Sequence, residues 1–469
     1  MSQIRSMTED KPAVLIVSFA LPLMVGNIFQ QLYTVVDTMV VGKALGVNAL
    51  AALGACDWLN WMMLGIIQGL TQGFAIRMAQ NFGAGRLEQL RRAVGGAAVL
   101  SVAGAVVLTV AGQAAARPVM MLLQTPPEIL GDALLYLRIM FFGVPIVMAY
   151  NLLASILRSL GDGKTPLRAM IVAAVVNIGL DLLFVLEFQW GIAGAAAATL
   201  IAQLISSLFC LWHIGRIEFL RLRREHLRLS PALAGALLLL GSPMAFQNGI
   251  IAVGGMIVQS VVNGFGVTFI AGFTATNKLY GVLEIAATSY GYSMITYTGQ
   301  NLGAGKLERI RGGVRQAAGL AVVTSLVITA AMFLFGRTIL GGFISGTPQE
   351  VAKTMEVAWF YLAVMSVCLP VLYLLHVVRS AIQGMGNTVL PMVSGIAEFV
   401  MRTGAAVFLP RIVGESGIFY AEILAWLGAD VILISSYFVT MRRVEREWAA
   451  GKGDLDGKSS AERSDSGVV

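Results

Sequence analysis

Long apolar runs constrain this chain more than any other feature of its sequence. Each run of about 20 residues can cross the roughly 30 Å hydrocarbon core of a bilayer as one helix. Hydrophobic residues make up 57% of the chain and charged residues only 13%, which is more apolar side chain than a water-facing surface tolerates. The sequence therefore predicts an all-α integral membrane protein with twelve transmembrane helices, near 13–41, 48–72, 93–113, 130–156, 167–186, 191–214, 232–262, 268–296, 314–336, 354–378, 389–410 and 416–440.

The chain also contains an internal duplication. Residues 80–88 read QNFGAGRLE, and residues 300–308, which lie 220 positions further on, read QNLGAGKLE. We interpret these twin segments as turns at the membrane face, where glycine lets the chain bend sharply, and not as ligand sites. Two parallel six-helix repeats follow from the offset. The predicted parts are an N-terminal lobe at 1–215, a cytoplasmic linker at 216–230, a C-terminal lobe at 231–441 and a polar, disordered cytoplasmic tail at 442–469.

The positive charges predict the orientation in the membrane. The net charge is +7, but the basic residues are not spread evenly over the chain. On a twelve-helix path, 25 of the 33 Lys and Arg residues fall on one side and five on the other. Cytoplasmic loops carry the excess of Lys and Arg, so both termini are expected in the cytoplasm of a multi-pass protein of the cell membrane. The basic character is thus a topology signal, with lipids as partners and no nucleic acid.

Several chemistries are not supported by the sequence. The three cysteines all fall within apolar runs, where Cys usually behaves as a small hydrophobe, so we expect no disulfide framework and no metal site apart from a sodium ion at the coupling site described below. Residues 161–165 (GDGKT) superficially resemble a phosphate-binding loop, but no strand precedes them. From the short polar segment before the first apolar run we expect no cleavable signal peptide. We expect a monomer with no cofactor and no enzymatic activity.

Ionisable residues inside the apolar runs are the functional candidates, because a charge in the bilayer core is costly. Asp37, Asn177, Asp181 and Thr199 fall at similar depth in the outer half of the N-terminal lobe when helix lengths are converted to distance. Two carboxylates, an amide and a hydroxyl at one level can hold a sodium ion or share a proton. A structural role in bridging helices near the interface is the alternative for the two acids.

Charged residues in the C-terminal half form a second group of candidates. Glu398 and Arg402 are four residues apart and most simply form an ion pair within one helix, which favours a structural role. Lys278 and Glu284 are six apart and need partners on another helix. We also expect Asp57 to be a solvated residue near a helix start. As cavity or secondary charge sites we consider Glu284, Lys278, Glu398, Arg402, Glu422 and Asp430.

The chain resembles the multidrug and toxic compound extrusion (MATE) family over residues 8–441. The resemblance rests on Val36-Asp37-Thr38 with Gly42, the twin segments, residues 158–165, and residues 177–181 with 194–199. It implies a secondary active efflux transporter that exchanges small cationic or amphipathic compounds for H+ or Na+ by alternating access. It further implies an N-lobe cation site at Asp37, Asn177, Asp181 and Thr199.

Within that family the pattern is closer to the DinF-type branch than to the NorM-type branch. NorM-type members carry acids in helices seven and ten, whereas here helix seven has none and helix ten offers His376 and Arg379 near its inner end. The DinF-type resemblance implies that coupling resides in the N-terminal lobe.

Three other functions remain open from the sequence. A flippase for a lipid-linked oligosaccharide would share the helix count, although only Arg138, Lys278 and Arg402 are available to bind an acidic headgroup. A major-facilitator carrier would also have twelve spans, but residues 77–92 lack the motif of that group. An intramembrane enzyme would need a nucleophile and a base, and the three histidines are scattered.

Overall fold

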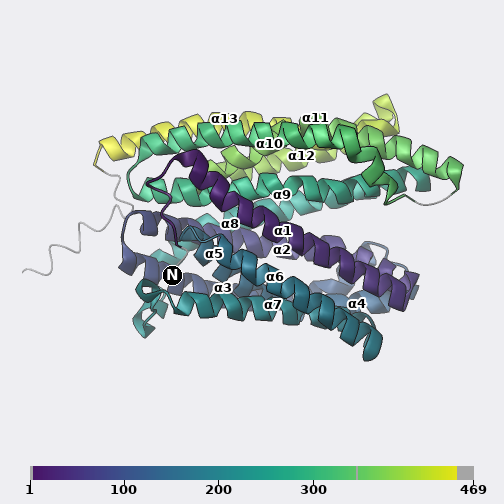
Figure 1. The fold of residues 1–469 in the computed structure, drawn as a ribbon, viewed down its shortest axis with the longest axis horizontal. Coiled ribbons are helices and arrows are strands. Elements are labelled where there is room, and N and C mark those ends of the chain that lie inside the picture. Colours follow the sequence, from purple (N-terminus) through teal and green to yellow (C-terminus); the bar gives the residue numbers. More distant parts are fainter. Residues whose placement is uncertain (1–3, 345–346, 452–469) are drawn as a thin grey trace, which may run out of the picture.

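The structure is a computed structural model that describes residues 4–344 and 347–451. Within these residues the chain forms thirteen α-helices and no strand (Figure 1). Their bounds are α1 (Pro12–Leu45), α2 (Val47–Gly83), α3 (Leu87–Leu122), α4 (Pro127–Phe142), α5 (Val144–Ser159), α6 (Lys164–Asp181), α7 (Gly191–Gly215), α8 (Pro231–Val262), α9 (Val267–Gly303), α10 (Leu307–Gly341), α11 (Pro348–Gly384), α12 (Val389–Val413) and α13 (Phe419–Ala449).

These helices supply the membrane spans that the apolar runs predict. In the described part of the chain, ten helices are long and apolar enough to cross a membrane alone, and α4 with α5, which meet at a 48° bend, make an eleventh. The remaining long helix, α9, has 37 residues but is more polar because it carries Lys278 and Glu284. The prediction of an all-α, multi-pass membrane protein is confirmed.

Helices from the two halves of the chain lie in two groups that meet along their length (Figure 1). The helices α1 to α7 form one group, and α8 to α13 form the other. The central contacts are made by α2, which packs against α8 and α9, and by α1, which packs against both α6 and α9. A movement of α1 or α2 therefore changes packing contacts in both halves.

Two predicted segments outside the helix groups can be located. The predicted linker, 216–230, contains two short 3-10 turns, η2 (Glu218–Leu220) and η3 (Arg224–Leu227). The helix α13 continues to Ala449, which lies within the predicted tail. The rest of that tail, from 452 onward, lies outside the described residues.

The twin segments end α2 and α9, and they lie against each other at the predicted cytoplasmic end of the molecule. A Cβ atom at Gly83 would overlap the carbonyl oxygen of Gln300, and one at Gly303 would overlap that of Gln80. This close approach requires glycine at both positions. Each segment then turns through a glycine of positive φ, +70° at Gly85 and +71° at the equivalent position of the second copy. The predicted turns are present, and they also join the two halves.

Hydrogen bonds across the halves repeat the same symmetry. The Gln80 side chain donates to the carbonyl oxygen of Gly384 at the end of α11, at 3.2 Å. Its counterpart Gln300 donates to the carbonyl oxygen of Ser159 at the end of α5, at 2.8 Å. Both glutamines are buried. We call this arrangement of residues 80–85 and 300–305 the inner latch.

The segment before α1 lies across the inner latch. The backbone N–H of Met7 donates to the Gln300 side chain at 2.8 Å, and its carbonyl accepts from Asn301 at 2.9 Å. Further along, Lys306 donates to the carbonyl of Thr8. The carbonyl of Arg5 meanwhile lies against Gly161 of the N-terminal half. The N-terminal segment therefore contacts both halves at the end where they are closed.

Candidate functional site

The two acids predicted in the N-terminal half are brought together by the packing of α1 against α6. Asp37 lies on α1 and is 9% exposed, whereas Asp181 is the last residue of α6 and is fully buried. The charge of Asp37 acts on Asp181, as expected for two acids in neighbouring helices. Asn177, one turn before Asp181 on the same face of α6, is also fully buried.

The polar atoms of this group lack protein partners. Within the described residues, no hydrogen bond reaches Asp37 Oδ1, either carboxylate oxygen of Asp181, or either polar atom of the Asn177 side chain. Buried polar groups are nearly always hydrogen-bonded, so five unmatched atoms in one place need an explanation. Four of the five are oxygen acceptors, which a sodium ion or a proton shared between the carboxylates can satisfy, whereas Asn177 Nδ2 is a donor.

The local backbone sets the depth of the site. Beyond Asp181 the chain continues as a π-helical segment, η1 (Leu182–Glu187), and segments of this kind are frequent at functional sites. Asp37 lies eight residues before the end of α1, and Thr199 lies eight residues after the start of α7. Both are therefore about 12 Å from these helix ends, which are predicted to face outward. The helix α7 packs against α6, η1 and α1, so the four predicted residues lie on neighbouring elements.

Asp57 belongs to the same neighbourhood, which the sequence did not predict. It lies ten residues inside α2 and not near the helix start, although its side chain is exposed, as expected. Asp57 lies close enough to Asp37 for the two like charges to repel each other. Lys278 on α9 lies close enough to Asp57 for the opposite charges to attract. Lys278 thus has an acidic neighbour, contributed by the other half of the chain. Helix boundaries hid this relation, since the apolar run that marks the span begins at 48, close to Asp57.

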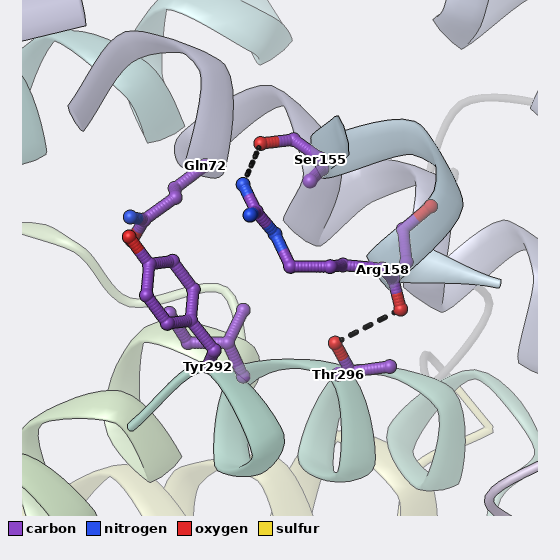
Figure 2. A pocket seen from close by; sticks show the side chains of 8 residues that line it. Gln72, Ser155, Arg158, Tyr292 and Thr296 are labelled. Carbon is purple, nitrogen blue, oxygen red and sulfur yellow. Dashed lines mark hydrogen bonds between the residues drawn. The ribbon is translucent and has the colours of Figure 1, made fainter. Parts of the chain in front are cut away.

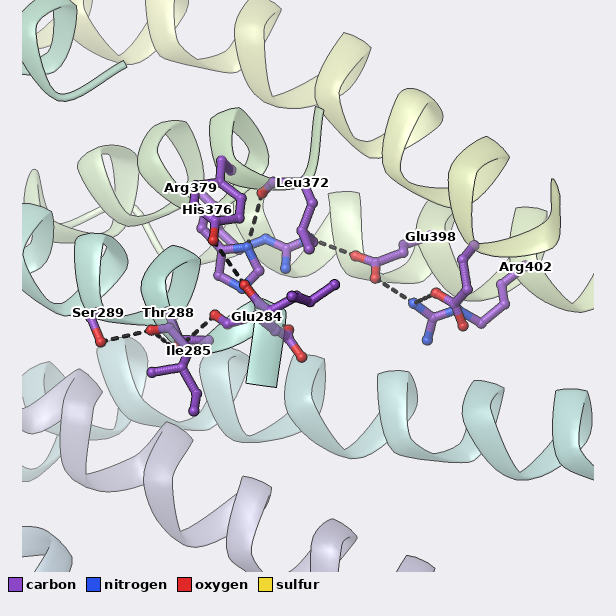
Figure 3. Close-up of polar contacts among 12 residues, drawn as sticks. Glu284, Ile285, Thr288, Ser289, Leu372, His376, Arg379, Glu398 and Arg402 are labelled. Atoms are coloured by element: carbon purple, nitrogen blue, oxygen red, sulfur yellow. Dashed lines mark hydrogen bonds and ion pairs between the residues drawn. The ribbon is translucent and has the colours of Figure 1, made fainter. Parts of the chain in front are cut away.

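In the C-terminal half, buried charges form a chain of ion pairs (Figure 3). Arg379 on α11 and Arg402 on α12 both bind Glu398, at 2.6 and 2.9 Å. Arg402 also binds Glu422 on α13 at 2.8 Å. The predicted pair of Glu398 and Arg402 is present as the middle link in a chain of four residues that joins three helices. Since these charges are matched one to one, the arrangement suits a structural role.

Two further acids lie next to this chain of ion pairs. Glu284 on α9 faces His376 on α11, with 3.6 Å between His Nε2 and the carboxylate (Figure 3). Asp430 on α13 is buried, and its Oδ1 has no hydrogen-bond partner among the described residues. Among the six secondary candidates, Glu284, Glu398, Arg402 and Glu422 therefore pair with residues of other helices.

A pocket of about 60 Å³, which we call the central pocket, lies among α1, α2, α5, α6 and α7 of the N-terminal half, and among its lining residues Tyr292 of α9 comes from the other half. A smaller pocket adjoins it, and Arg158 and Tyr292 line both (Figure 2). Gly26 and Pro22 of α1 also reach the larger pocket, so the helix that carries Asp37 forms part of its wall. Sequence reasoning does not reveal this pocket, because residues that line such a space form no linear motif.

Known proteins resemble this chain over most of its length. The family model described as MatE matches residues 22–183 and 243–407. The probable multidrug resistance protein YpnP of Bacillus subtilis is 29% identical over 351 residues, which cover 74% of this chain and 78% of the relative. The probable multidrug resistance protein NorM of Thermotoga maritima is 23% identical, with 90% of each chain covered. A protein named FAD transporter, from Shewanella oneidensis, is 23% identical over 75% of this chain and 77% of its own.

Solved structures share the fold. A crystal structure of MATE in complex with MaL6 has a TM-score of 0.86 at 21% identity and covers 95% of this chain and 99% of its own. An outward-facing conformation of a multidrug resistance MATE family transporter gives the same TM-score, identity and coverage. A MOP superfamily transporter from Pyrococcus furiosus gives a TM-score of 0.87 at 21% identity, covering 95% of this chain and 98% of its own.

Proposed function

This chain belongs to the MatE family of transporters, and from that premise we propose that it is a secondary active efflux transporter whose coupling ion binds between Asp37 and Asp181. It exchanges small amphipathic organic compounds for H+ or Na+ across the cell membrane. Two relatives are named for multidrug resistance and for FAD transport, and these names support small organic compounds as the substrates.

One observation carries the proposal of the coupling site. Asp37, Asn177 and Asp181 are buried in the outer half of the N-terminal lobe with five polar atoms that have no partner in the described residues. Two like charges close together in low dielectric repel each other, so a bound cation or proton stabilises them strongly. Thr199 on α7 completes the proposed ligand set.

The helix α1 can couple ion binding to substrate binding, because it takes part in both sites. It carries Asp37, lines the central pocket, and packs against both α6 and α9. An ion that draws Asp37 toward Asp181 changes how α1 sits between the halves, and it favours whichever arrangement binds that ion more tightly. The inner latch closes the cytoplasmic end in the present arrangement, and alternating access requires it to open.

The remaining parts of the proposal concern layout. We assign residues 1–215 and 231–441 to the two lobes that move against each other, and both termini to the cytoplasm. Placement of the coupling site in the N-terminal lobe favours the DinF-type branch. The paired charges of the C-terminal half support this choice, because they leave Glu398 and Arg402 neutralised within the protein.

Transport in reconstituted vesicles tests the coupling site. Vesicles containing the full chain are given a pH gradient or a sodium gradient, one at a time, and the movement of ethidium and of 7-methoxycoumarin-4-acetic acid is followed by fluorescence. We expect one gradient to drive transport by the wild type, and D37N or D181N to reduce it to the rate of protein-free vesicles. The control D132N removes an exposed acid of α4 in the same half and should transport normally. Gradient-driven transport by D37N at the wild-type rate would move the coupling site elsewhere.

A further inference from the structure

The central pocket has an unusual polarity. Five of its side chains are amides, and these come from four different helices: Asn27, Gln30, Gln68, Asn151 and Gln203. Only one lining residue, Arg158, carries a charge. The volume of about 60 Å³ holds the polar end of an organic compound and not a whole drug-sized molecule.

Arg158 has no carboxylate partner within residues 4–344 and 347–451 of the structure. Its Nη2 donates to the Ser155 hydroxyl at 2.8 Å, and its guanidinium lies over the Tyr292 ring, 4.7 Å from the centroid (Figure 2). The nearby acid Asp162 is instead engaged by the backbone N–H groups of Lys164 and Thr165, at 3.0 and 2.9 Å. A guanidinium has five N–H donors, so most of the Arg158 donors remain for another group.

This setting contrasts with the arginines of the C-terminal half. Arg379 and Arg402 are buried beside carboxylates that neutralise them. Arg158 is half-buried, and in the described part of the chain its guanidinium contacts a hydroxyl and an aromatic face but no carboxylate. A half-buried cation of this kind attracts an anion, and a guanidinium binds a carboxylate or phosphate through two parallel hydrogen bonds.

From this geometry we propose that the central pocket binds the acidic group, carboxylate or phosphate, of an aromatic compound. Arg158 supplies the counter-charge, the pocket amides donate further hydrogen bonds, and Tyr292 offers its ring to the aromatic part. A purely cationic end is disfavoured here, because it meets the Arg158 charge with no acid in the lining. The inference rests on the proposed export function and narrows its substrate class to compounds that carry an acid.

The position of the pocket fits a transported compound. Tyr292 comes from α9 and Arg158 from α5, so the two halves of the chain meet at the ligand. On the cytoplasmic side, the Thr296 hydroxyl donates to the carbonyl oxygen of Arg158 at 3.2 Å, next to the inner latch. Opening of the latch separates Arg158 from Tyr292, and the compound then loses one side of its site.

Equilibrium binding with a matched pair of probes tests the proposal. The purified full chain in detergent is titrated with 7-methoxycoumarin-4-acetic acid and with its amide, which have the same ring and differ in charge. A charged hydrogen-bonded contact contributes enough for about a ten- to hundredfold preference for the acid. In R158Q we expect the acid to lose that factor while the amide changes less than about twofold. Equal binding of acid and amide to the wild type would overturn the proposal, as would equal losses in R158Q.

Further variants separate recognition from structure. R158K keeps the charge but lacks the fork, so it should retain part of the acid preference even if R158Q unfolds. Y292L should weaken acid and amide alike, since stacking does not depend on the acid. R138Q, which removes an exposed cation of α4, should leave the preference intact. A purely structural role of Arg158 as a contact between the halves predicts that both probes are lost together.

Two further measurements distinguish a lipid headgroup from a soluble ligand, and a failure of the anion pocket from a failure of the coupling site. Displacement of the coumarin acid by phosphatidylglycerol in mixed micelles, with no displacement by phosphatidylcholine, would assign the site to a lipid headgroup and overturn the proposal for a soluble compound. Binding at equilibrium needs no gradient, so D37N should keep the acid preference even though it abolishes coupled transport. The coupling site and the anion pocket can therefore fail independently.

Discussion

Individual charged residues are balanced differently in the two halves of this protein. In the C-terminal half, Glu398 and its arginine partners satisfy one another. In the N-terminal half, Asp37 and Asp181 are buried with unmatched oxygens. A charge in the bilayer core costs on the order of 2.5–3.5 kcal/mol even by the lower estimates. Buried acids without a protein partner are therefore expected where they bind an ion or a proton.

Asp37 and Asp181 are expected to act as one unit. If a single ion or proton is shared between them, loss of either acid destroys the site, and loss of the second removes nothing further. The double variant D37N/D181N should therefore transport no less than either single variant, and all three should lose the dependence of substrate binding on pH or sodium. Transport assays and equilibrium binding on the same preparations check this. A double variant clearly worse than both single variants would indicate two independent sites.

The chain of ion pairs in the C-terminal half makes a second prediction at this scale. Removing Glu398 leaves Arg379 without a partner, although Arg402 keeps Glu422. Breaking a buried pair by removing one member costs about 3–5 kcal/mol. E398Q should therefore lower the thermal unfolding temperature, and E398Q/R379M should recover much of the loss, because the pair of Arg402 and Glu422 survives intact.

The matched comparison is E398Q/R402M, which leaves Arg379 and Glu422 both unpaired. From the spacing of Glu398 and Arg402 alone, this double variant should be the one that recovers. In the structure it removes the two central residues of the chain, and with them all three ion pairs, so it should be no more stable than E398Q. Melting curves of the purified variants decide between these rankings. Stable but inactive single variants would instead show that the pairs are functional.

For the helices, the sequence predicts that each one exists better than it predicts where each one ends or how it is rotated about its axis. Apolar runs locate the spans because the bilayer demands them, but α2 continues to Gly83 and α11 to Gly384, beyond the apolar part. The pair of Glu398 and Arg402 is visible from its spacing within one helix. The links to Arg379 and Glu422 are not, since contacts between helices depend on how each is rotated about its axis. The unmatched Arg158 is hidden for the same reason.

Adding one methyl group to the inner latch should open the cytoplasmic end of the protein. G303A places a Cβ atom against the carbonyl oxygen of Gln80, so the two segments must separate. Overpacking of this kind costs about 1–3 kcal/mol, which equals a shift of roughly 5–150-fold toward states with an open cytoplasmic end. A cysteine placed at Ser155, which is buried beside Arg158, should react faster with a membrane-impermeant maleimide added from the cytoplasmic side.

The control for the latch is G312A, on the adjacent helix α10. A Cβ atom at Gly312 meets nothing within 4 Å, so labelling should stay at the wild-type rate. Faster labelling in G312A as well would mean that helix α10, and not the latch, governs access. Unchanged labelling in G303A would show that the contact between the twin segments does not hold the cytoplasmic end closed.

For the whole molecule, the duplication and the distribution of charge together predict the orientation in the membrane. Two parallel repeats can have the same orientation only if each contains an even number of spans, and the described chain supplies six membrane-length elements before residue 216 and six after 230 when α4 and α5 count as one. The linker 216–228 holds five arginines, and the twin segments lie at the same end of the molecule. We therefore expect all of these parts on the cytoplasmic side.

Reporter fusions test this orientation. A reporter inserted within 216–230 and one fused after residue 469 should both give a cytoplasmic signal, because an even number of spans separates them. A reporter near Gln189, between η1 and α7, should give an external signal, since that connection lies at the opposite end of α7 from the linker. A cytoplasmic signal at Gln189 together with an external one from the linker would invert the molecule. The proposed coupling site, about 12 Å below one set of helix ends, would then face the cytoplasm.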